Sequence, residues 1–370
     1  MRPPHTAKRG VNFAPRTGRE LRPDAVTVPV TTPPSTLTVS ELGEQAIIER
    51  IVRRLEIPAW VDIGPGDDAA VVKPPRGRRE VLTTDALVEG VHFDRAFVPP
   101  DAVGHRALAV NLSDVAAMGG EPRAALLSLA LPGGLPSAFL DGFLDGFLRH
   151  AAAHRTAILG GNITQTPGPL VINVTAIGTV KPRRALTRAG ARPGDGVYIT
   201  GWIGDAAAGL AMLRHGGVNG STAATMDSPC VSRYLRPEPR LQAGLQLANY
   251  QAASSCVDLS DGLADGLRQI ARSSGVGIEI DAAALPLSDL ARAWHAAAGT
   301  DAIRGALAGG DDYELLFTVR PRHRGRLRGV RRRIGDLPIT RIGVVTRTLE
   351  LAVRDGSGTR DLPPGFEHFR

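Results

Sequence analysis

Lysine is almost absent from this chain. Only three lysines, Lys8, Lys73 and Lys181, occur among the 44 basic residues, and none of them completes the pattern G-x-x-x-x-G-K-[ST]. A P-loop, which holds nucleotide phosphates with a lysine and a glycine-rich turn, is therefore excluded. If the chain handles phosphates, it must use metal ions, arginine and backbone N–H groups instead.

Cysteine and long apolar runs are also scarce. The two cysteines, Cys230 and Cys256, argue against a disulfide framework and against a thiolate zinc site. The longest apolar stretch, near residues 124–132, is too short to span a membrane and ends at Pro132. The basic N-terminus has no apolar run of the kind found in a secretory signal. We therefore expect a cytoplasmic protein without a membrane partner.

The length and composition are typical of a globular protein with two domains. The chain has 370 residues, of which 43% are hydrophobic and 22% charged. Residues 1–38 contain seven prolines, six basic and two acidic side chains, and are interpreted as a disordered tail or the product of a misplaced start codon. The basic, proline-bearing segment 181–195 predicts a boundary, with domains over 39–182 and 183–370. The arginine run 320–333 is interpreted as a solvated surface, so no nucleic-acid partner is expected.

Apolar periodicity predicts the main elements. A helix is expected over 41–55 with Ser40 as its N-cap, and strands over 81–88 and 170–180. A second helix is expected over 101–118, and its apolar stripe leads to Asp114. A buried carboxylate is costly unless it is paired or holds a metal, which favours a functional role for Asp114.

Five acidic clusters lie at the edges of apolar elements. The central one is VLTTDALVEGVHF, residues 81–93, in which a strand ends in oxygen-bearing side chains, although a threonine–aspartate run alone is often a simple turn. Hard cations such as Mg²⁺ take oxygen ligands. The other clusters are GPGDDAA at 64–70, NLSD at 111–114, VDLSD at 257–261 and GGDDYELLF at 309–317.

The number of carboxylates favours metal chemistry over glycoside hydrolysis, for which two acids suffice. Ser260 and Asp261 also have a structural interpretation as the cap and first turn of a helix, but Asp258, at the end of an apolar strand, does not. Two like charges 4 Å apart repel by about 4 kcal/mol at an effective dielectric constant near 20. Divalent cations offset that repulsion, so the clusters predict Mg²⁺ chemistry on phosphates.

With these motifs assembled, the chain from about residue 40 onwards resembles thiamine-monophosphate kinase, a family of the aminoimidazole ribonucleotide synthetase superfamily of ATP-using enzymes. The family's motifs appear in order: G-x-G-D-D-A, T-T-D-x-L-V-E-G-V-H-F, V-N-L-S-D-x-A-A-M-G, A-L-T-R-x-G-A-x-P-G-D, D-L-S-D-G-L, G-G-x-D-Y-E-L and a terminal G-[aromatic]-x-H-F. The resemblance implies an α/β (α+β) fold of two domains, each a mixed sheet covered by helices, with the N-terminal domains paired in a homodimer.

The resemblance also implies an activity and a set of site residues. The reaction is phosphorylation of thiamine monophosphate by ATP, with several Mg²⁺ ions and Asp85, Asp114 and Asp258 at its centre. The implied Mg²⁺ ligands are Asp68, Thr83, Thr84, Asp85, Asp114, Asn162, Asp258 and Asp261. The implied nucleotide contacts are Gly161, Asn162, Arg188 and Ser260, and the implied contacts to thiamine monophosphate are His92, Asp311 and Phe366.

The chemistry of the acceptor agrees with this set. A phosphate monoester, with a second pKa of about 6, is already a nucleophile at neutral pH and needs no general base. Catalysis then depends on in-line positioning and charge neutralisation, so His92 is interpreted as a substrate contact. Phe366 is expected to stack on the cationic thiazolium or, alternatively, to anchor the C-terminus in the core.

Two residues depart from the family pattern. Asn162 stands where the family's G-G-D-T has an aspartate, which predicts a raised Mg²⁺ requirement, and Asp311 is one methylene shorter than the family's glutamate. Alternative functions are another ATP-using member of the superfamily with a different acceptor, or a non-catalytic binder of nucleotide or thiamine phosphate.

Overall fold

The computed structural model describes residues 37–219, 226–356 and 358–365. Residues Thr36–Arg370 form one compact unit. The predicted tail lies almost wholly outside the described residues. Within the described ranges, no helix is long and apolar enough to cross a membrane.

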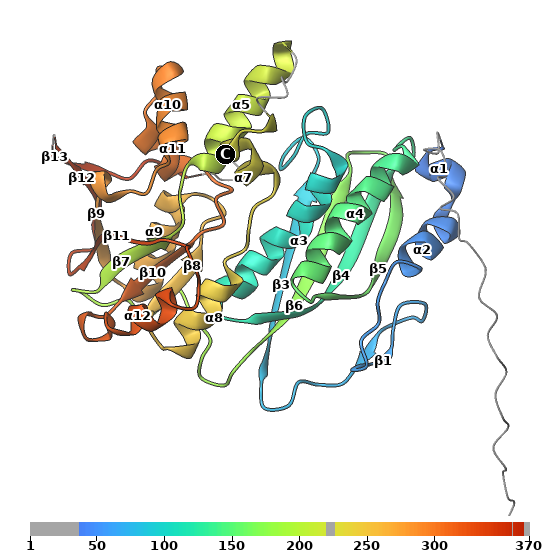
Figure 1. The fold of residues 1–370 in the computed structure, drawn as a ribbon, viewed down its shortest axis with the longest axis horizontal. Coiled ribbons are helices and arrows are strands. Elements are labelled where there is room, and N and C mark those ends of the chain that lie inside the picture. The colour runs from blue at the N-terminus through green and yellow to red at the C-terminus, as the bar shows by residue number, and fades with distance from the viewer. Residues whose placement is uncertain (1–36, 220–225, 357, 366–370) are drawn as a thin grey trace, which may run out of the picture. The chain divides into compact units, whose positions relative to one another are not determined.

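A four-stranded mixed sheet organises the first half of the chain. Its strands lie in the order β3-β6-β4-β5, and β4 and β5 run parallel whereas the other neighbours are antiparallel. Helices α3 and α4 cover one face of this sheet (Figure 1). The bounds are β3 (Arg79–Val88), α3 (Pro100–Ala117), β4 (Glu121–Pro132), α4 (Ser137–Ala153), β5 (Ala157–Thr166) and β6 (Val171–Val180).

Alternating side chains decide which face of this sheet is buried. Leu127 and Leu129 of β4 point toward the helices and are buried. Leu126 of β4 and Leu82 of β3 point to the other face, where their side chains are 38% and 66% exposed. The described part of the chain therefore leaves one face of the sheet with apolar residues in solvent.

Two glycines allow α3 and α4 to pack closely. A Cβ on Gly104 of α3 would collide with the carbonyl oxygen of Phe143, and one on Gly146 of α4 would collide with that of Asp101. Larger residues at these positions would push the helices apart, so α3 is held firmly over the sheet.

The N-terminal helix differs from its prediction. The chain forms α1 (Val39–Leu42) and α2 (Glu44–Val52), separated at Gly43, whose φ is 78°. The N-cap is Thr38 rather than Ser40, because Thr38 and Glu41 form a reciprocal capping box. Two short strands, β1 (Val61–Ile63) and β2 (Val71–Val72), follow and pair with each other.

A seven-stranded mixed sheet organises the second half. Its strand order is β13-β12-β9-β11-β7-β10-β8, with β9 and β12 parallel and the other neighbours antiparallel. The strands are β7 (Gly196–Thr200), β8 (Ser255–Asp258), β9 (Gly277–Asp281), β10 (Leu315–Val319), β11 (Ile339–Thr346), β12 (Leu351–Asp355) and β13 (Gly358–Asp361). The helices are α5 (Asp205–Asn219), α7 (Pro229–Leu235), α8 (Leu241–Asn249), α9 (Leu263–Ser274), α10 (Asp289–Ala297), α11 (Ala302–Ala308) and α12 (Arg326–Arg331).

The predicted fold class, two mixed sheets with helices, is confirmed. Strands β6 and β7 belong to different sheets, while the boundary between residues 182 and 183 stays a prediction.

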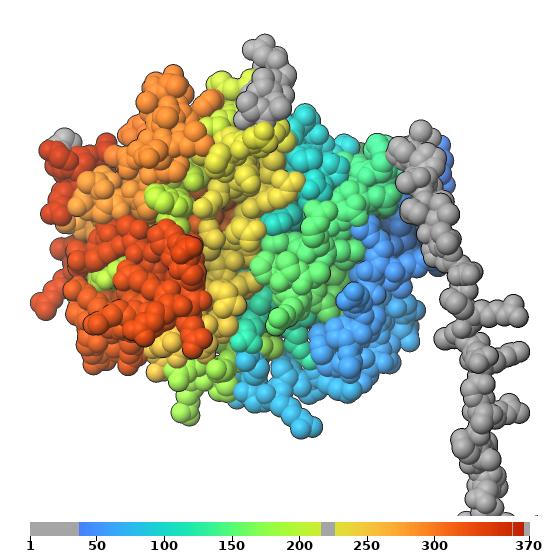
Figure 2. Space-filling view, viewed as in Figure 1, coloured from blue at the N-terminus to red at the C-terminus, as the bar shows by residue number. Residues whose placement is uncertain are grey.

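Helix α3 connects the two sheets. It packs on β3 and β6 on one side and on α8 and β8 on the other. One apolar cluster runs from Leu108 of α3 to Leu247 of α8 and Phe317 of β10. Figure 2 shows the yellow residues of the second half lying directly against the green residues of α4. Polar side chains on α3 can therefore meet residues of both sheets.

Candidate active site

Three predicted carboxylates meet at helix α3. Asp85 lies on β3 and its backbone N–H donates a 3.0 Å hydrogen bond to Asn111 Oδ1 of α3. Asp114 of α3 accepts a short hydrogen bond from the hydroxyl of Thr83 on β3. Strand β8 ends at Asp258, as predicted. The expectation that a strand ends at Thr83–Asp85 is wrong, because β3 continues to Val88. The middle of β3 and the end of β8 are thus linked to one helix.

The hydrogen bond between Ser113 and Asp258 completes that link. The Ser113 hydroxyl donates to Asp258 Oδ2 at 2.6 Å, and both residues are buried. Asp258 is 7% exposed. A carboxylate at this depth needs a partner, and Ser113 supplies one hydrogen bond without supplying positive charge.

The charges of the carboxylates act on one another's pKa values. Burial raises the pKa of Asp85 to about 6, helped by the negative charges of Asp114 and Asp261. Burial raises the pKa of Asp258 to about 7, helped by Asp114 and Asp85 and opposed by the Ser113 hydrogen bond. Burial also raises the pKa of Asp114, while Thr83 and the charge of Arg188 lower it. Four predicted acids and one predicted arginine therefore share one electrostatic environment.

This cluster suits a cation that takes only some of its ligands from the protein. In the described ranges, no three acidic, histidine or cysteine side chains converge as ligands of one ion. Mg²⁺ commonly takes one or two carboxylates and completes its shell with water and phosphate oxygens. Burial and mutual repulsion raise the pKa values of these acids, and Mg²⁺ ions held by one or two of the carboxylates each would supply the missing positive charge.

Ser260 and Asp261 belong to the loop between β8 and α9. Helix α9 begins at Leu263 with Gly262 as its N-cap and no side-chain cap, so the interpretation of Ser260 as a cap and of Asp261 as a first-turn residue is wrong. The Ser260 hydroxyl instead donates to Asp261 Oδ2 at 3.3 Å. The negative charge of Asp261 helps to raise the pKa of Asp85, so the loop carries an acid that acts on the cluster.

Three other predicted metal ligands lie apart from the cluster. Asp68 is exposed in the turn before β2, and its N–H bonds to Asp67 Oδ1 at 2.9 Å. Thr84 is on the uncovered face of the sheet, where its hydroxyl donates to Val174 O at 3.1 Å. Asn162 of β5 pairs with Ser128 and lies on the same uncovered face.

Asn162 is also separated from Asp85 along the sheet. Strands β3 and β5 are the two edges of the order β3-β6-β4-β5, and three strand spacings span about 14 Å. The neighbouring Gly161 cannot carry a side chain, because a Cβ there would collide with Leu127 O. Within one copy of the chain, Gly161 and Asn162 do not meet the carboxylate cluster.

Tyr234 and Arg106 connect His92 with Asp311, two of the residues predicted to contact thiamine monophosphate. Nδ1 of His92 accepts a hydrogen bond from Val88 N–H at 3.0 Å, and the Tyr234 hydroxyl donates to His92 O at 3.5 Å. Arg106 of α3 donates to Tyr234 O at 2.6 Å and to Asp311 Oδ1 at 2.5 Å. Asp311 lines a cavity of about 340 Å³ with residues of α5 and Gly309 and Gly310. Phe366 lies outside the described residues.

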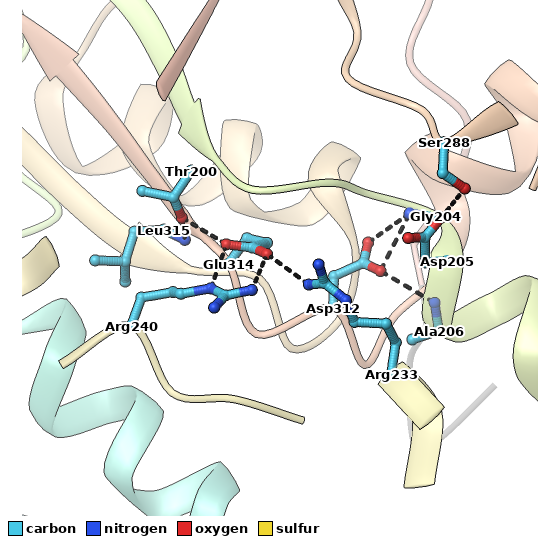
Figure 3. Close-up of polar contacts among 10 residues, drawn as sticks. All are labelled: Thr200, Gly204, Asp205, Ala206, Arg233, Arg240, Ser288, Asp312, Glu314 and Leu315. Atoms are coloured by element: carbon cyan, nitrogen blue, oxygen red, sulfur yellow. Dashed lines mark hydrogen bonds and ion pairs between the residues drawn. The ribbon is translucent and has the colours of Figure 1, made fainter. Parts of the chain in front are cut away.

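The GGDDYELLF segment carries two buried acids, Asp312 and Glu314, with partners from several elements (Figure 3). Asp312 accepts hydrogen bonds from the N–H groups of Gly204 and Ala206 at the start of α5. Glu314 is fully buried and binds Arg240 at 2.5 Å and Arg233 at 3.1 Å. Both acids fix the scaffold, which leaves Asp311 to face the cavity.

Sequence reasoning did not identify Arg106, Ser113 and Tyr234 as functional neighbours. Arg106 had one available signal, since it is a charged residue inside the apolar helical stretch VGHRALAV. Ser113 and Tyr234 had none, because their partners are distant in the sequence.

Comparison with known proteins first defines the class. The family model described as "AIR synthase related protein, N-terminal domain" matches residues 66–180, and the corresponding C-terminal domain model matches residues 192–356. Escherichia coli HypE has the same fold, with a TM-score of 0.70 at 21% identity over 86% of this chain and 98% of HypE. The chain is thus an AIR synthase related protein with both domains.

Closer relatives define the family. Thiamine-monophosphate kinase of Escherichia coli K12 is 40% identical over 88% of this chain and 98% of its own length, and that of Bacillus subtilis is 35% identical over 89% and 100%. The structure of AaThiL complexed with AMPPCP and TMP matches with a TM-score of 0.70 at 35% identity, over 90% of this chain and 99% of AaThiL. The chain belongs to the thiamine-monophosphate kinase family.

Proposed function

We propose that this chain transfers the terminal phosphoryl group of ATP to thiamine monophosphate, giving ADP and thiamine diphosphate. The relatives named for this activity are covered over nearly their whole length. The related AaThiL binds AMPPCP and TMP together. The observation that carries the proposal is the meeting of Asp85, Asp114 and Asp258 at α3, since charge neutralisation is the main catalytic demand of phosphoryl transfer.

The residues divide into three groups by role. Asp85, Asp114, Asp258 and Asp261 would hold the Mg²⁺ ions, whose positive charge would neutralise phosphate oxygens. Arg188, whose charge acts on Asp114, and Ser260 contact the nucleotide. His92 and Asp311 hold the acceptor, with Phe366 as a further contact to it that the family resemblance implies. No residue acts as a general base, because the acceptor monoester is already ionised near neutral pH.

A homodimer is part of the proposal. The uncovered face of the four-stranded sheet exposes Leu82 and Leu126, and a second copy packed there would bury them. The same face carries Thr84 and Asn162, so a second copy could bring Gly161 and Asn162 toward a neighbouring nucleotide. Replacing Leu82 with Asp is expected to yield a monomer in sedimentation, with loss of activity. A dimeric, active L82D protein would refute this arrangement.

The test of the activity is ADP production by the full chain. We expect ADP to form in equal amounts with thiamine diphosphate when thiamine monophosphate, ATP and Mg²⁺ are all present. Omitting Mg²⁺, or replacing the acceptor with unphosphorylated thiamine, should abolish it. If thiamine monophosphate binds without turnover, the chain is a binder; if ADP forms only with a different acceptor, it is another member of the superfamily. The reaction is placed in the cytoplasm, where ATP is available.

A further inference from the structure

Arg106 is a buried charge that the proposed mechanism does not use. It lies within α3, four residues after Ala102, and is 1% exposed. Burying a guanidinium is costly unless its hydrogen bonds and its charge are satisfied. An arginine at such a position therefore calls for a reason beyond packing, and its partners indicate one.

Arg106 binds Asp311, one of the proposed contacts to the phosphoryl acceptor. One terminal nitrogen donates to Asp311 Oδ1 at 2.5 Å, and the other donates to Tyr234 O at 2.6 Å. The guanidinium also lies over the Tyr234 ring at 4.6 Å. Its Nε is buried, and no partner for it occurs within the described ranges. The guanidinium is thus fixed in orientation, and it fixes Asp311 in turn.

Asp311 is held in an unfavourable backbone conformation. Its φ is 70° and that of Tyr313 is 49°, and both values lie in the left-handed region that non-glycine residues rarely adopt. Such residues persist where their surroundings determine the conformation, and they concentrate at ligand sites. The N–H of Asp311 donates to Ser260 O at 2.7 Å, which ties this backbone to the nucleotide loop.

The two carboxylate oxygens of Asp311 have different surroundings. Oδ1 accepts from Arg106 and from the Tyr313 hydroxyl, the latter at 3.3 Å. Oδ2 has no hydrogen-bond donor among the residues that the structure describes, and the side chain is 29% exposed beside the 340 Å³ cavity. One oxygen is therefore held by the protein and the other is left for a ligand.

We propose that Arg106 is a positioning residue for the acceptor: by holding Oδ1 of Asp311, it directs Oδ2 toward the cationic ring system of the bound substrate. This assignment rests on the proposed kinase function. Arg106 belongs to the helix that carries Asp114, so the same element would set both the metal cluster and the acceptor contact. The spacing of Arg106 and Asp114 along α3 would then match the distance between the ring system and the phosphate of the acceptor.

Two roles for Arg106 predict opposite results. A positioning role means that its removal lets Asp311 rotate, so that the acceptor binds less well. A role in charge balance alone means that its removal leaves Asp311 with a full negative charge, which would bind a cationic acceptor more tightly. The two roles are distinguished by whether the KM for thiamine monophosphate rises or falls.

The experiment compares Arg106→Met and Arg106→Lys with wild-type full chain in steady-state assays of ADP release. We expect R106M to raise the KM for thiamine monophosphate at least tenfold while the KM for ATP changes less than twofold. The KM of R106K for thiamine monophosphate should lie between those of R106M and wild type. Lysine restores the positive charge but lacks the planar fork with which arginine bonds two partners at once. In an Asp311→Asn background, R106M should add less than a twofold change.

Arg236→Met is the matched control. Arg236 also connects α3 to the second half, through a 2.7 Å ion pair with Asp101, but it does not touch Asp311. R236M should leave both KM values within twofold. An unchanged or lowered acceptor KM in R106M, or equal changes in R106M and R236M, would overturn the assignment. If R106M does not fold, R106K decides by the same criterion. A wild-type chain that releases no ADP with thiamine monophosphate would instead refute the kinase proposal.

Discussion

The Ser113 hydroxyl donates a 2.6 Å hydrogen bond to Asp258 Oδ2 and so joins the helix over one sheet to the end of a strand in the other. That bond lowers the pKa of Asp258, whereas burial and the charges of Asp114 and Asp85 raise it, and the outcome is a pKa of about 7. Without a cation, this carboxyl group therefore binds a proton at a higher pH than a free aspartate does. Protons and Mg²⁺ compete for the same cluster.

This competition predicts how stability depends on pH. Asp85 and Asp258 have pKa values of about 6 and 7 in the folded chain, above the value of about 3.9 expected when unfolded. Between these values the folded chain binds more protons, so the metal-free protein loses stability as pH rises through the window from about 4 to 7. Mg²⁺, which binds the deprotonated folded cluster, opposes that loss.

The measurement is the thermal midpoint with Mg²⁺ and with a chelator. We expect the Mg²⁺-induced increase to be larger at about pH 7.5 than at about pH 5.5, because protons occupy the cluster at the lower pH. Other titrating groups contribute equally with and without Mg²⁺, so the difference isolates the cluster. An increase of the same size at both pH values would contradict the prediction.

The buried network around Glu314 predicts a large loss of stability. Glu314→Gln leaves Arg240, which is 15% exposed, without its counter-charge and also weakens the bond to Arg233. Breaking one side of a buried ion pair typically costs about 3–5 kcal/mol. The check is the free energy of unfolding in denaturant, with Glu49→Gln as control. Glu49 forms an exposed pair with Arg53, for which a loss of about 0.5 kcal/mol is expected. Equal losses in both variants would refute this account.

Local patterns in the sequence predict part of this site. Asp258 ends the apolar strand β8 and Asp114 continues the apolar stripe of α3, so periodicity places both at the edge of the core. Asp85 instead lies within β3, which the apolar pattern alone does not explain. The residues that hold these acids are not local. Ser113 and Asp258 are separated by 145 positions, and Arg106 and Asp311 by 205. No periodicity reports which distant strand a helix will touch.

The face on which a residue lies also escaped prediction. Thr83 and Thr84 are adjacent in one motif, yet Thr83 bonds Asp114 under α3 while Thr84 points to the uncovered face. Side chains alternate along a strand, so a run of potential ligands must divide between two faces. The motif identified the strand but not the face of each residue. That Asn162 lies far from Asp85 becomes clear only from the order of the strands in the sheet.

A histidine cluster on α3 and α4 predicts acid sensitivity. The ring centroids of His105 and His150 are 3.8 Å apart, and those of His150 and His154 are 4.5 Å apart. Burial, helped by these neighbours, lowers the pKa of His150 to about 2. The unfolded chain, with a pKa near 6.5, then binds the extra proton, so stability is lost as pH falls below about 6.5.

The variant that tests this cluster is His150→Phe, which fills similar space without titrating. Between about pH 7 and pH 5 the wild-type chain should lose about 2 kcal/mol through this residue. The variant should lose about that much less than wild type over the same interval, in denaturant unfolding at saturating Mg²⁺. An equal loss in both proteins would show that the ring titrates alike in the folded and unfolded chains.

Because Asn162 is uncharged, we expect weak Mg²⁺ binding, which the single substitution Asn162→Asp should strengthen. Asn162→Asp adds a carboxylate where the amide contributes no net charge, and one added charge near a bound cation is worth about 1 kcal/mol under solvent-like screening. We expect the half-saturating Mg²⁺ concentration for ADP release to fall about threefold to tenfold. Thr164→Asp is the control, because Thr164 lies two residues further along the same exposed face of β5. It adds equal charge about 6.6 Å along the strand from position 162, where it cannot serve as a ligand of the same ion, and should change that concentration less than N162D does. Equal effects of the two substitutions would mean that Asn162 acts only through the general field, and no effect of N162D would mean that it binds no ion.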